Sequence, residues 1–236
     1  MQIIKSEKLE TLKDEIDFII ETVCEGIRYI KCIRSRAKKH DWGAAEYFLD
    51  LADDKVIDLI MTGNQGPPPY WKEFYKLIFL AISEKKIPPE HFDIIRSELV
   101  KFAFTTIHSV LQSPEIMNDT PIIPSKFDKL KNEFIRILNH TIEGWLSIGN
   151  AWQYANDYHW DYAEDALKSY KAVIDTLATI SGHPPSNTWI HHYDCVRDAL
   201  SKQTTWGQTH MHTLRGVLVP LARTACIQTL KNLNIF

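Results

Sequence analysis

An apolar stripe near the N-terminus constrains the fold of this chain more than any other feature. From Leu9 onward, apolar residues recur at alternating spacings of three and four, and Gly26 occupies the one missing position. This spacing places the stripe along one face of an α-helix. Its members are Leu9, Leu12, Ile16, Ile19, Val23, Ile30, Ile33 and Ala37. The stripe predicts a helix of about 30 residues that is buried within the chain rather than in a dimer seam.

Helices are predicted along the rest of the chain as well. Asp41 is expected to N-cap a second helix that ends near Met61, with Gly63 as the residue just after it. A third helix is expected from about Pro69 to Lys85, and Pro88-Pro89 opens a fourth that ends near Leu111. The third helix should bury Phe74, Leu77, Ile78, Ala81 and Ile82.

Four further helices are expected to begin near residues 125, 160, 188 and 207. The chain has only nine glycines and few alternating apolar and polar runs, which disfavours a β-sandwich or barrel. The sequence therefore predicts an all-α bundle of about eight helices with a long N-terminal helix.

The segment 113–125 contains three prolines and is the longest predicted connection between helices. It separates an N-terminal helical half, 1–112, from a C-terminal half, 126–236, and we expect the halves to form one compact unit. The second half holds five of the seven tryptophans and seven of the ten histidines.

One stretch of the C-terminal half resembles a single tetratricopeptide repeat. Trp145, Ile148, Gly149 and Trp152 have the spacing of the first helix of that repeat, and Ala166 and Tyr170 have that of the second. The resemblance implies a helical hairpin. No second copy follows at the family's period of about 34 residues.

Composition and motifs exclude several classes of protein. A net charge of −3 offers no global field for nucleic acid. The N-terminus lacks a secretory signal and no apolar run approaches the ~18–20 residues that cross a bilayer, so we predict a cytoplasmic protein without a membrane partner. The sequence has no phosphate loop, dinucleotide fingerprint, GxSxG or HExxH motif. We therefore predict no cofactor and favour a role without catalysis.

A basic cluster lies at the end of the first predicted helix. It contains Arg28, Lys31, Arg34, Arg36, Lys38 and Lys39, followed by His40. Such a cluster can bind a phosphate backbone. However, the next helix carries Glu46, Asp50, Asp53, Asp54 and Asp58. We favour neutralisation of the basic helix by this acidic helix in a hairpin, and keep nucleic-acid binding as an alternative.

Within the cluster, Arg34 and His40 have a spacing that resembles the catalytic motif of HEPN-type ribonucleases, a family of small helical bundles. The resemblance implies that the arginine and histidine of paired subunits converge on a scissile RNA phosphate. A HEPN-like ribonuclease is therefore one alternative function.

A second alternative is a metal-dependent enzyme. His191 and Cys195 lie one turn apart on a predicted helix, and His210 and His212 lie on the next. A His/Cys pair at this spacing can hold one face of a zinc ion, and a neighbouring helix can complete the site.

The leading hypothesis is a non-catalytic protein-binding module, such as an adaptor, a small subunit of a larger assembly or an immunity-type inhibitor. Protein interfaces are enriched in tryptophan, tyrosine and arginine. The predicted anchors, if exposed, are Trp189, Tyr193, Arg197 and Trp206.

Overall fold

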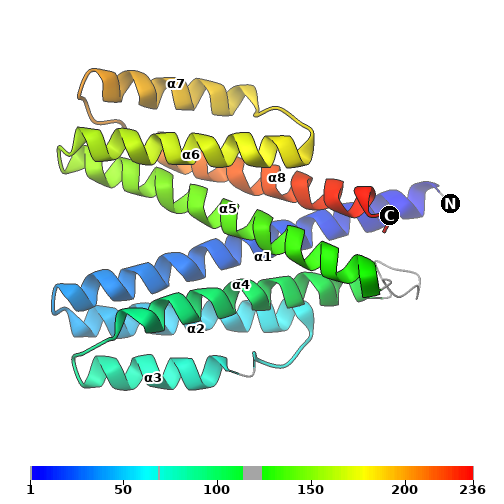
Figure 1. Cartoon of the computed structure of the whole chain (residues 1–236), viewed down its shortest axis with the longest axis horizontal. Helices are drawn as coiled ribbons and strands as arrows, with labels where there is room; N and C mark the ends of the chain where they lie inside the picture. The colour runs from blue at the N-terminus through cyan, green and yellow to red at the C-terminus, as the bar shows by residue number, and fades with distance from the viewer. Residues whose placement is uncertain (1, 69, 114–123, 236) are drawn as a thin grey trace. The chain divides into compact units, whose positions relative to one another are not determined.

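The computed structural model describes residues 2–68, 70–113 and 124–235. These residues form eight helices and no strand, which confirms the predicted all-α fold (Figure 1). None of the helices in these ranges is both long and apolar enough to span a bilayer. The helices are α1 Gln2–Lys38, α2 Trp42–Gly63, α3 Trp71–Ser83, α4 Pro89–Gln112, α5 Pro124–Asn156, α6 Trp160–Ser181, α7 Asn187–Ser201 and α8 Gln208–Asn232.

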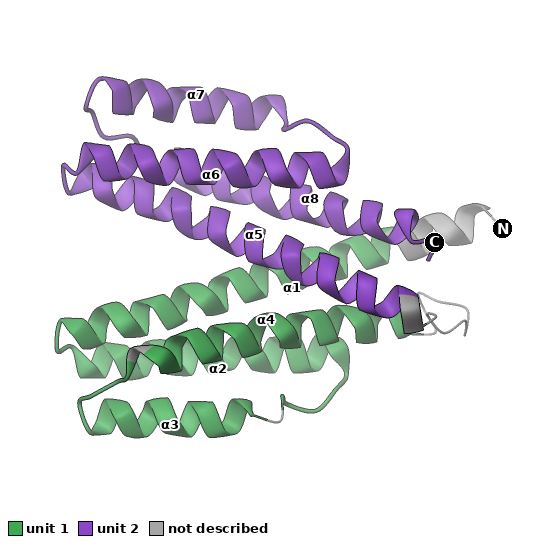
Figure 2. Cartoon of the chain, viewed as in Figure 1, with its two compact units in different colours: residues 1–121 green, residues 122–236 purple. Residues whose placement is uncertain are grey.

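The chain divides into two compact units of four helices each, unit 1 at residues 1–121 and unit 2 at residues 122–236 (Figure 2). Most of the connection predicted at 113–125, residues 114–123, lies outside the described residues. In each unit the first helix packs against the second and the fourth, and the third helix packs against those same two.

The apolar stripe of α1 is buried as predicted. Leu12, Ile16, Ile19 and Val23 have no exposed surface, and the stripe packs toward α2 and α4. Leu9 is the one stripe member whose side chain lies outside the described residues.

The ends of α2 were predicted in part. Asp41 is the N-cap, and its Oδ1 accepts a hydrogen bond from the backbone N–H of Ala44 at 3.3 Å. The prediction for Gly63 was wrong, because Gly63 is the last helical residue and Asn64 adopts the left-handed conformation with φ 45°. Asparagine tolerates this region because its short polar side chain can bond locally. Gly63 is buried, and its carbonyl accepts a hydrogen bond from Ser109 Oγ at 2.6 Å.

The predicted buried face of α3 was wrong at Leu77. Ile78, Ala81 and Ile82 are buried and Phe74 is half-buried, but the Leu77 side chain is 44% exposed. Because α3 packs mainly against α2 and α4, one side of this short helix remains open.

The two units are copies of one four-helix pattern. Positions in α1 to α3 correspond to positions 118 residues further along the chain, so that α2, Trp42–Gly63, matches α6, Trp160–Ser181. Three residues with left-handed backbone in unit 1 have left-handed counterparts at this spacing. The pairs are His40 with Tyr158, Asn64 with Gly182 and Lys85 with Gln203.

Identical residues mark the same register. Shared positions in the first three helices include Gly26 and Gly144, Trp42 and Trp160, Leu49 and Leu167, Trp71 and Trp189, and Tyr75 and Tyr193. In α4 and α8 the spacing becomes 119, because the connection that precedes α8 is one residue longer. Shared positions there include His91 and His210, Arg96 and Arg215, Leu99 and Leu218, and Leu111 and Leu230.

The matched glycines make equivalent contacts. A Cβ atom on Gly26 would lie 2.8 Å from Leu99 Cδ2, and one on Gly144 would lie 3.1 Å from Leu218 Cδ2. Because the two leucines are counterparts, each unit uses a glycine in its first helix to admit the same leucine of its fourth helix.

The predicted hairpin at Trp145 is the α5–α6 pair. Gly149 of this hairpin faces α8 and not α6. A Cβ atom on Gly149 would lie 2.1 Å from Arg215 Nη2. The Arg215 guanidinium lies 5.4 Å from the centre of the Trp145 ring, and Arg215 Nε donates to the Trp145 carbonyl at 3.3 Å. Gly149 therefore makes room for an arginine of α8.

Substitution of Gly26 tests the close contact between α1 and α4. We expect Gly26→Leu to lower the free energy of unfolding by about 1–3 kcal/mol, because Leu99 is fully buried and must shift to admit the new side chain. Gly43→Leu is the matched control, since a Cβ atom there meets nothing within 4 Å. Its effect should stay within about 0.5 kcal/mol. Urea denaturation followed by circular dichroism measures both, and equal effects would contradict the proposed packing role.

Candidate functional site

The basic cluster lies on the last turns of α1 and in the turn that follows. Lys31, Arg34, Arg36, Lys38 and Lys39 are exposed, and Arg28 is half-buried. Arg36 Nη1 pairs with Asp41 Oδ2 at 3.3 Å. Within the described residues, Arg34, Lys38 and Lys39 form no ion pair or hydrogen bond through their side chains. The cluster therefore keeps most of its charge at the surface.

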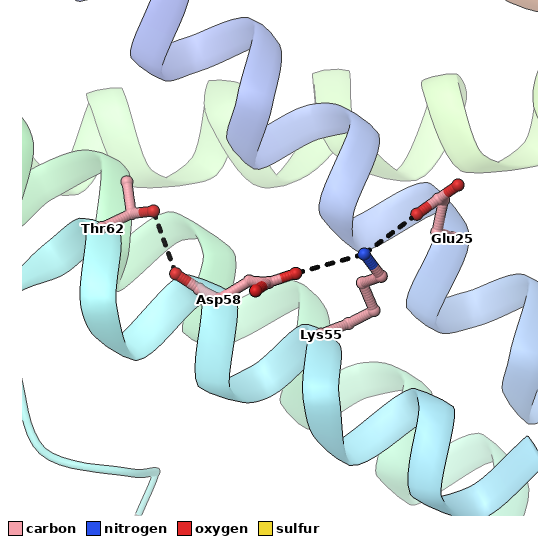
Figure 3. Close-up of polar contacts among 4 residues, drawn as sticks. All are labelled: Glu25, Lys55, Asp58 and Thr62. Carbon is pink, nitrogen blue, oxygen red and sulfur yellow. Dashed lines mark hydrogen bonds and ion pairs between the residues drawn. The ribbon is translucent and has the colours of Figure 1, made fainter.

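The acidic helix packs beside α1 as a hairpin, and neutralisation of the basic cluster by this helix stays a prediction. An ion pair joins α1 to α2 with the reverse of the predicted polarity: Lys55 Nζ of α2 lies 3.1 Å from Glu25 Oε2 of α1 (Figure 3). Asp58 Oδ2 also lies 3.1 Å from Lys55 Nζ. Partial burial lowers the pKa of Lys55, but its hydrogen bonds to Asp58 and Glu25 outweigh burial and the pKa is raised.

Two other acids of α2 bind α3 instead of α1. Trp71 Nε1 donates to Asp53 Oδ1 at 2.6 Å, and the Tyr75 hydroxyl donates to Asp50 Oδ1 at 2.8 Å. Burial, followed by the hydrogen bond to Asp50, raises the pKa of Tyr75 to about 12. Two of the five carboxylates that were expected to balance the basic cluster thus bind α3.

Arg34 and His40, the residues that resemble a ribonuclease motif, are both exposed. Arg34 lies in α1, whereas His40 lies in the following turn with a φ of 59°. The His40 ring contacts the Trp42 ring at 6.2 Å between centroids. No hydrogen bond among the described residues joins Arg34 to His40, and a catalytic role for this pair stays a prediction.

An aromatic ladder accompanies the basic cluster. The Arg28 guanidinium lies 4.9 Å from the centre of the Tyr29 ring, and Tyr29 stacks on Phe48 of α2 at 6.1 Å. Tyr47 packs against Phe48 at 5.6 Å and is 60% exposed. This end of the α1–α2 hairpin therefore presents cations beside an accessible aromatic ring.

The predicted protein-binding anchors are mostly interior residues. Trp189, Tyr193 and Trp206 are buried, and a buried side chain cannot anchor a partner at the surface. Trp189 stacks on Tyr193 at 4.8 Å and donates through Nε1 to the Tyr170 hydroxyl at 3.0 Å. Arg197 is exposed and pairs with Asp194 at 3.0 Å.

The four candidate metal ligands do not come together. His191 Nε2 lies 3.9 Å from Cys195 Sγ, but His210 faces a different residue, with its Nδ1 2.9 Å from Nδ1 of His192. His212 is exposed. In the part of the chain that the structure describes, no group of three or more His, Cys, Asp or Glu residues is arranged to hold a metal ion.

A hollow of about 410 Å³ lies in unit 1. One side is formed by the segment that follows α2 and the other side by α4. Its lining comprises Gln65, Gly66, Pro67, Pro68, Glu98, Lys101, Phe102 and Thr105. Lys101 Nζ pairs with Glu98 Oε1 at 2.7 Å, and Thr105 Oγ1 donates to the Lys101 carbonyl. Gln65 Nε2 donates to Thr106 Oγ1 at 2.8 Å, so these polar side chains have partners and form no acid–base or nucleophilic pair with one another.

A group of exposed apolar residues was missed by sequence reasoning. Among the described residues, nine of twelve exposed large apolar side chains belong to unit 1. Six of them lie in α2, in α3 or just before α3, and we call this set the outer face. Its members are Ile57, Met61, Tyr70, Leu77, Phe79 and Leu80. The signal in the sequence was the run of six consecutive apolar residues at 77–82 in α3, because a flanking helix can bury only part of such a run.

Unit 2 provides an internal comparison for the outer face. The corresponding positions are Asp175, Thr179, Thr188, Cys195, Arg197 and Asp198. Because unit 2 builds the same helices with these residues, the apolar side chains of the outer face are not needed to form the fold.

A comparison of the chain with models of protein families, with curated proteins and with solved structures finds no match.

The histidine pair between α7 and α8 predicts a pH dependence of stability. Partial burial, together with His210 and His191, lowers the pKa of His192 below its ordinary value. The unfolded chain therefore binds a proton at this site more readily than the folded chain. The stability that the neutral His192 side chain gives the folded chain is complete above about pH 6.5 and should be lost as the pH falls below it.

His192→Phe is the matching substitution, because Phe74 holds the equivalent position in unit 1. The urea midpoint of this variant should fall less between pH 7.5 and pH 5.5 than that of the natural chain. His212→Gln, at an exposed histidine, should leave the loss unchanged. An identical pH dependence in all three proteins would contradict the assignment to His192.

Proposed function

We propose that this chain is a non-catalytic protein-binding module that docks a partner on the outer face of unit 1. The observation that carries the proposal is the exposure of Met61, 75%, and Leu80, 55%, where unit 2 has Thr179 and Asp198. Single exposed apolar residues are ordinary on protein surfaces. A group of them that the fold does not require is typical of an interaction site.

The charges around the outer face favour a basic partner. Asp50 and Asp54 of α2 are exposed, and their counterparts in unit 2 are Lys168 and Ala172. Acidic residues at these two positions are therefore particular to unit 1, although α6 carries acidic residues at other positions. We infer that the partner presents an apolar helix stripe flanked by lysine or arginine on the side that meets α2.

This proposal includes an adaptor or subunit role and a cytoplasmic location. Docking through a helix face needs no bound cofactor.

The test exchanges outer-face residues for those of unit 2. Affinity capture from the native host with the natural chain, followed by measurement of the dissociation constant of the captured partner, provides the reference. We expect Ile57→Asp, Met61→Thr and Leu80→Asp together to weaken binding at least tenfold, because truncation of a well-packed interface residue costs about 1–2 kcal/mol.

The matched control is Ile190→Lys. It replaces an exposed apolar residue of unit 2 with lysine, the residue type found at the equivalent position of unit 1, Lys72. This variant should bind as the natural chain does, and both variants should keep their helical signal. A partner that binds the triple variant with unchanged affinity would refute docking on the outer face.

A further inference from the structure

The basic end of α1 presents a second surface that the proposed docking face does not use. Lys31, Arg34 and Lys38 recur at spacings of three and four, so they lie along one side of the helix. They span about 10 Å at 1.5 Å per residue. Arg36 and Lys39 add charge beside them, and no acidic residue occurs from Gly26 to His40.

Fold stability does not explain this charge. Lysine or arginine near a helix C-terminus is favoured by the helix dipole, but α5, the counterpart of α1, has no basic residue in its last turn. The positions in unit 2 that match the six cationic residues are Leu146, Gly149, Trp152, Tyr154, Asn156 and Asp157. The same helix therefore forms in unit 2 without a single cation at these positions.

The aromatic ladder is also particular to unit 1. Tyr29, Tyr47 and Phe48 are replaced in unit 2 by Ser147, Asp165 and Ala166. Phe48 supports Tyr47 from one side, while the Tyr47 ring keeps 60% of its surface exposed. An accessible ring on α2 and a row of cations on α1 are the two kinds of element that bind single-stranded nucleic acids, a stacking platform and a positive track for the backbone.

We propose that the basic end of α1 binds single-stranded nucleic acid. Arg34, Lys38 and Lys39 contact phosphates, and an unpaired base stacks on Tyr47. Single strands are preferred over duplexes because the face of a base is accessible only when the base is unstacked. The polyanion is attracted locally even though the net charge of the chain is −3.

Fluorescence anisotropy with labelled oligonucleotides tests this inference. The probes are a single-stranded RNA and a single-stranded DNA of about 20 nucleotides, a duplex of the same length, and vesicles with phosphatidylserine, at ~50 mM salt. We expect the natural chain to bind at least one single strand more tightly than the duplex. The tighter of the two single strands identifies the class of nucleic acid.

Two variants separate the contributions of charge and stacking. Arg34→Gln, Lys38→Gln and Lys39→Gln together should reduce the slope of log affinity against log salt by about 2, since each phosphate contact contributes about 0.7 on a single strand. Tyr47→Ala should weaken single-strand binding about tenfold and leave duplex binding unchanged. The matched control, Lys129→Gln, Lys131→Gln and Lys168→Gln, removes three exposed charges from unit 2 and should bind as the natural chain does.

Several results would overturn the inference. They are no binding of either strand at ~50 mM salt, equal or tighter binding of the duplex, binding of vesicles alone, and a triple variant of α1 that keeps the natural affinity and salt slope. The outer-face variant should bind oligonucleotides normally, so failure of this inference and failure of the proposed function are distinguishable.

Discussion

Each unit depends on the close contact between its long first helix and the helices that pack on it. Gly26 and Gly144 allow this contact, because any side chain there would meet Leu99 or Leu218. Both leucines are completely buried. Once the first and fourth helices are held at this distance, the second helix covers their shared side and the third helix can only flank the assembly. The open side of α3 follows from that arrangement, whereas the apolar residues on it are particular to unit 1.

The helices were largely predictable from the sequence because burial imposes three-four spacing on apolar residues. The prediction of α6 at about 160–181 coincides with the observed Trp160–Ser181. The left-handed end of α2 was not predictable from glycine alone, since Asn64 takes that conformation and Gly63 is used for close packing. Local rules name the residue types that can end a helix, but packing decides which neighbour does so.

The candidate site was predicted less well than the fold. Trp189 and Tyr193 belong, with Val196 and Leu200, to a stripe at three-four spacing, and that pattern could have identified them as buried. The partners of the α2 carboxylates could not be predicted, because Asp50 and Asp53 meet α3 only through tertiary packing. The internal repeat was missed because its shared residues are scattered over core positions and its spacing changes by one before the last helix.

The repeat separates what the fold requires from what the surface adds. Core positions such as Leu49 and Leu167 agree between the units, whereas the outer face and the basic end of α1 do not. The two surfaces that distinguish unit 1 are of different chemistry, one apolar and acidic, the other cationic and aromatic. A single four-helix pattern thus carries two specialised surfaces in one copy and neither of them in the other.

The short turn between α1 and α2 has a consequence for folding kinetics. Lys39, His40 and Asp41 alone connect the two helices that share the most extensive interface of unit 1. Bringing these helices together closes a very small loop, so we expect the hairpin to form early and quickly. The slower step is the return of α4 to α1, which must close a loop several times longer before Leu99 can reach Gly26. We therefore expect the contact between Gly26 and Leu99 to form after the α1–α2 hairpin.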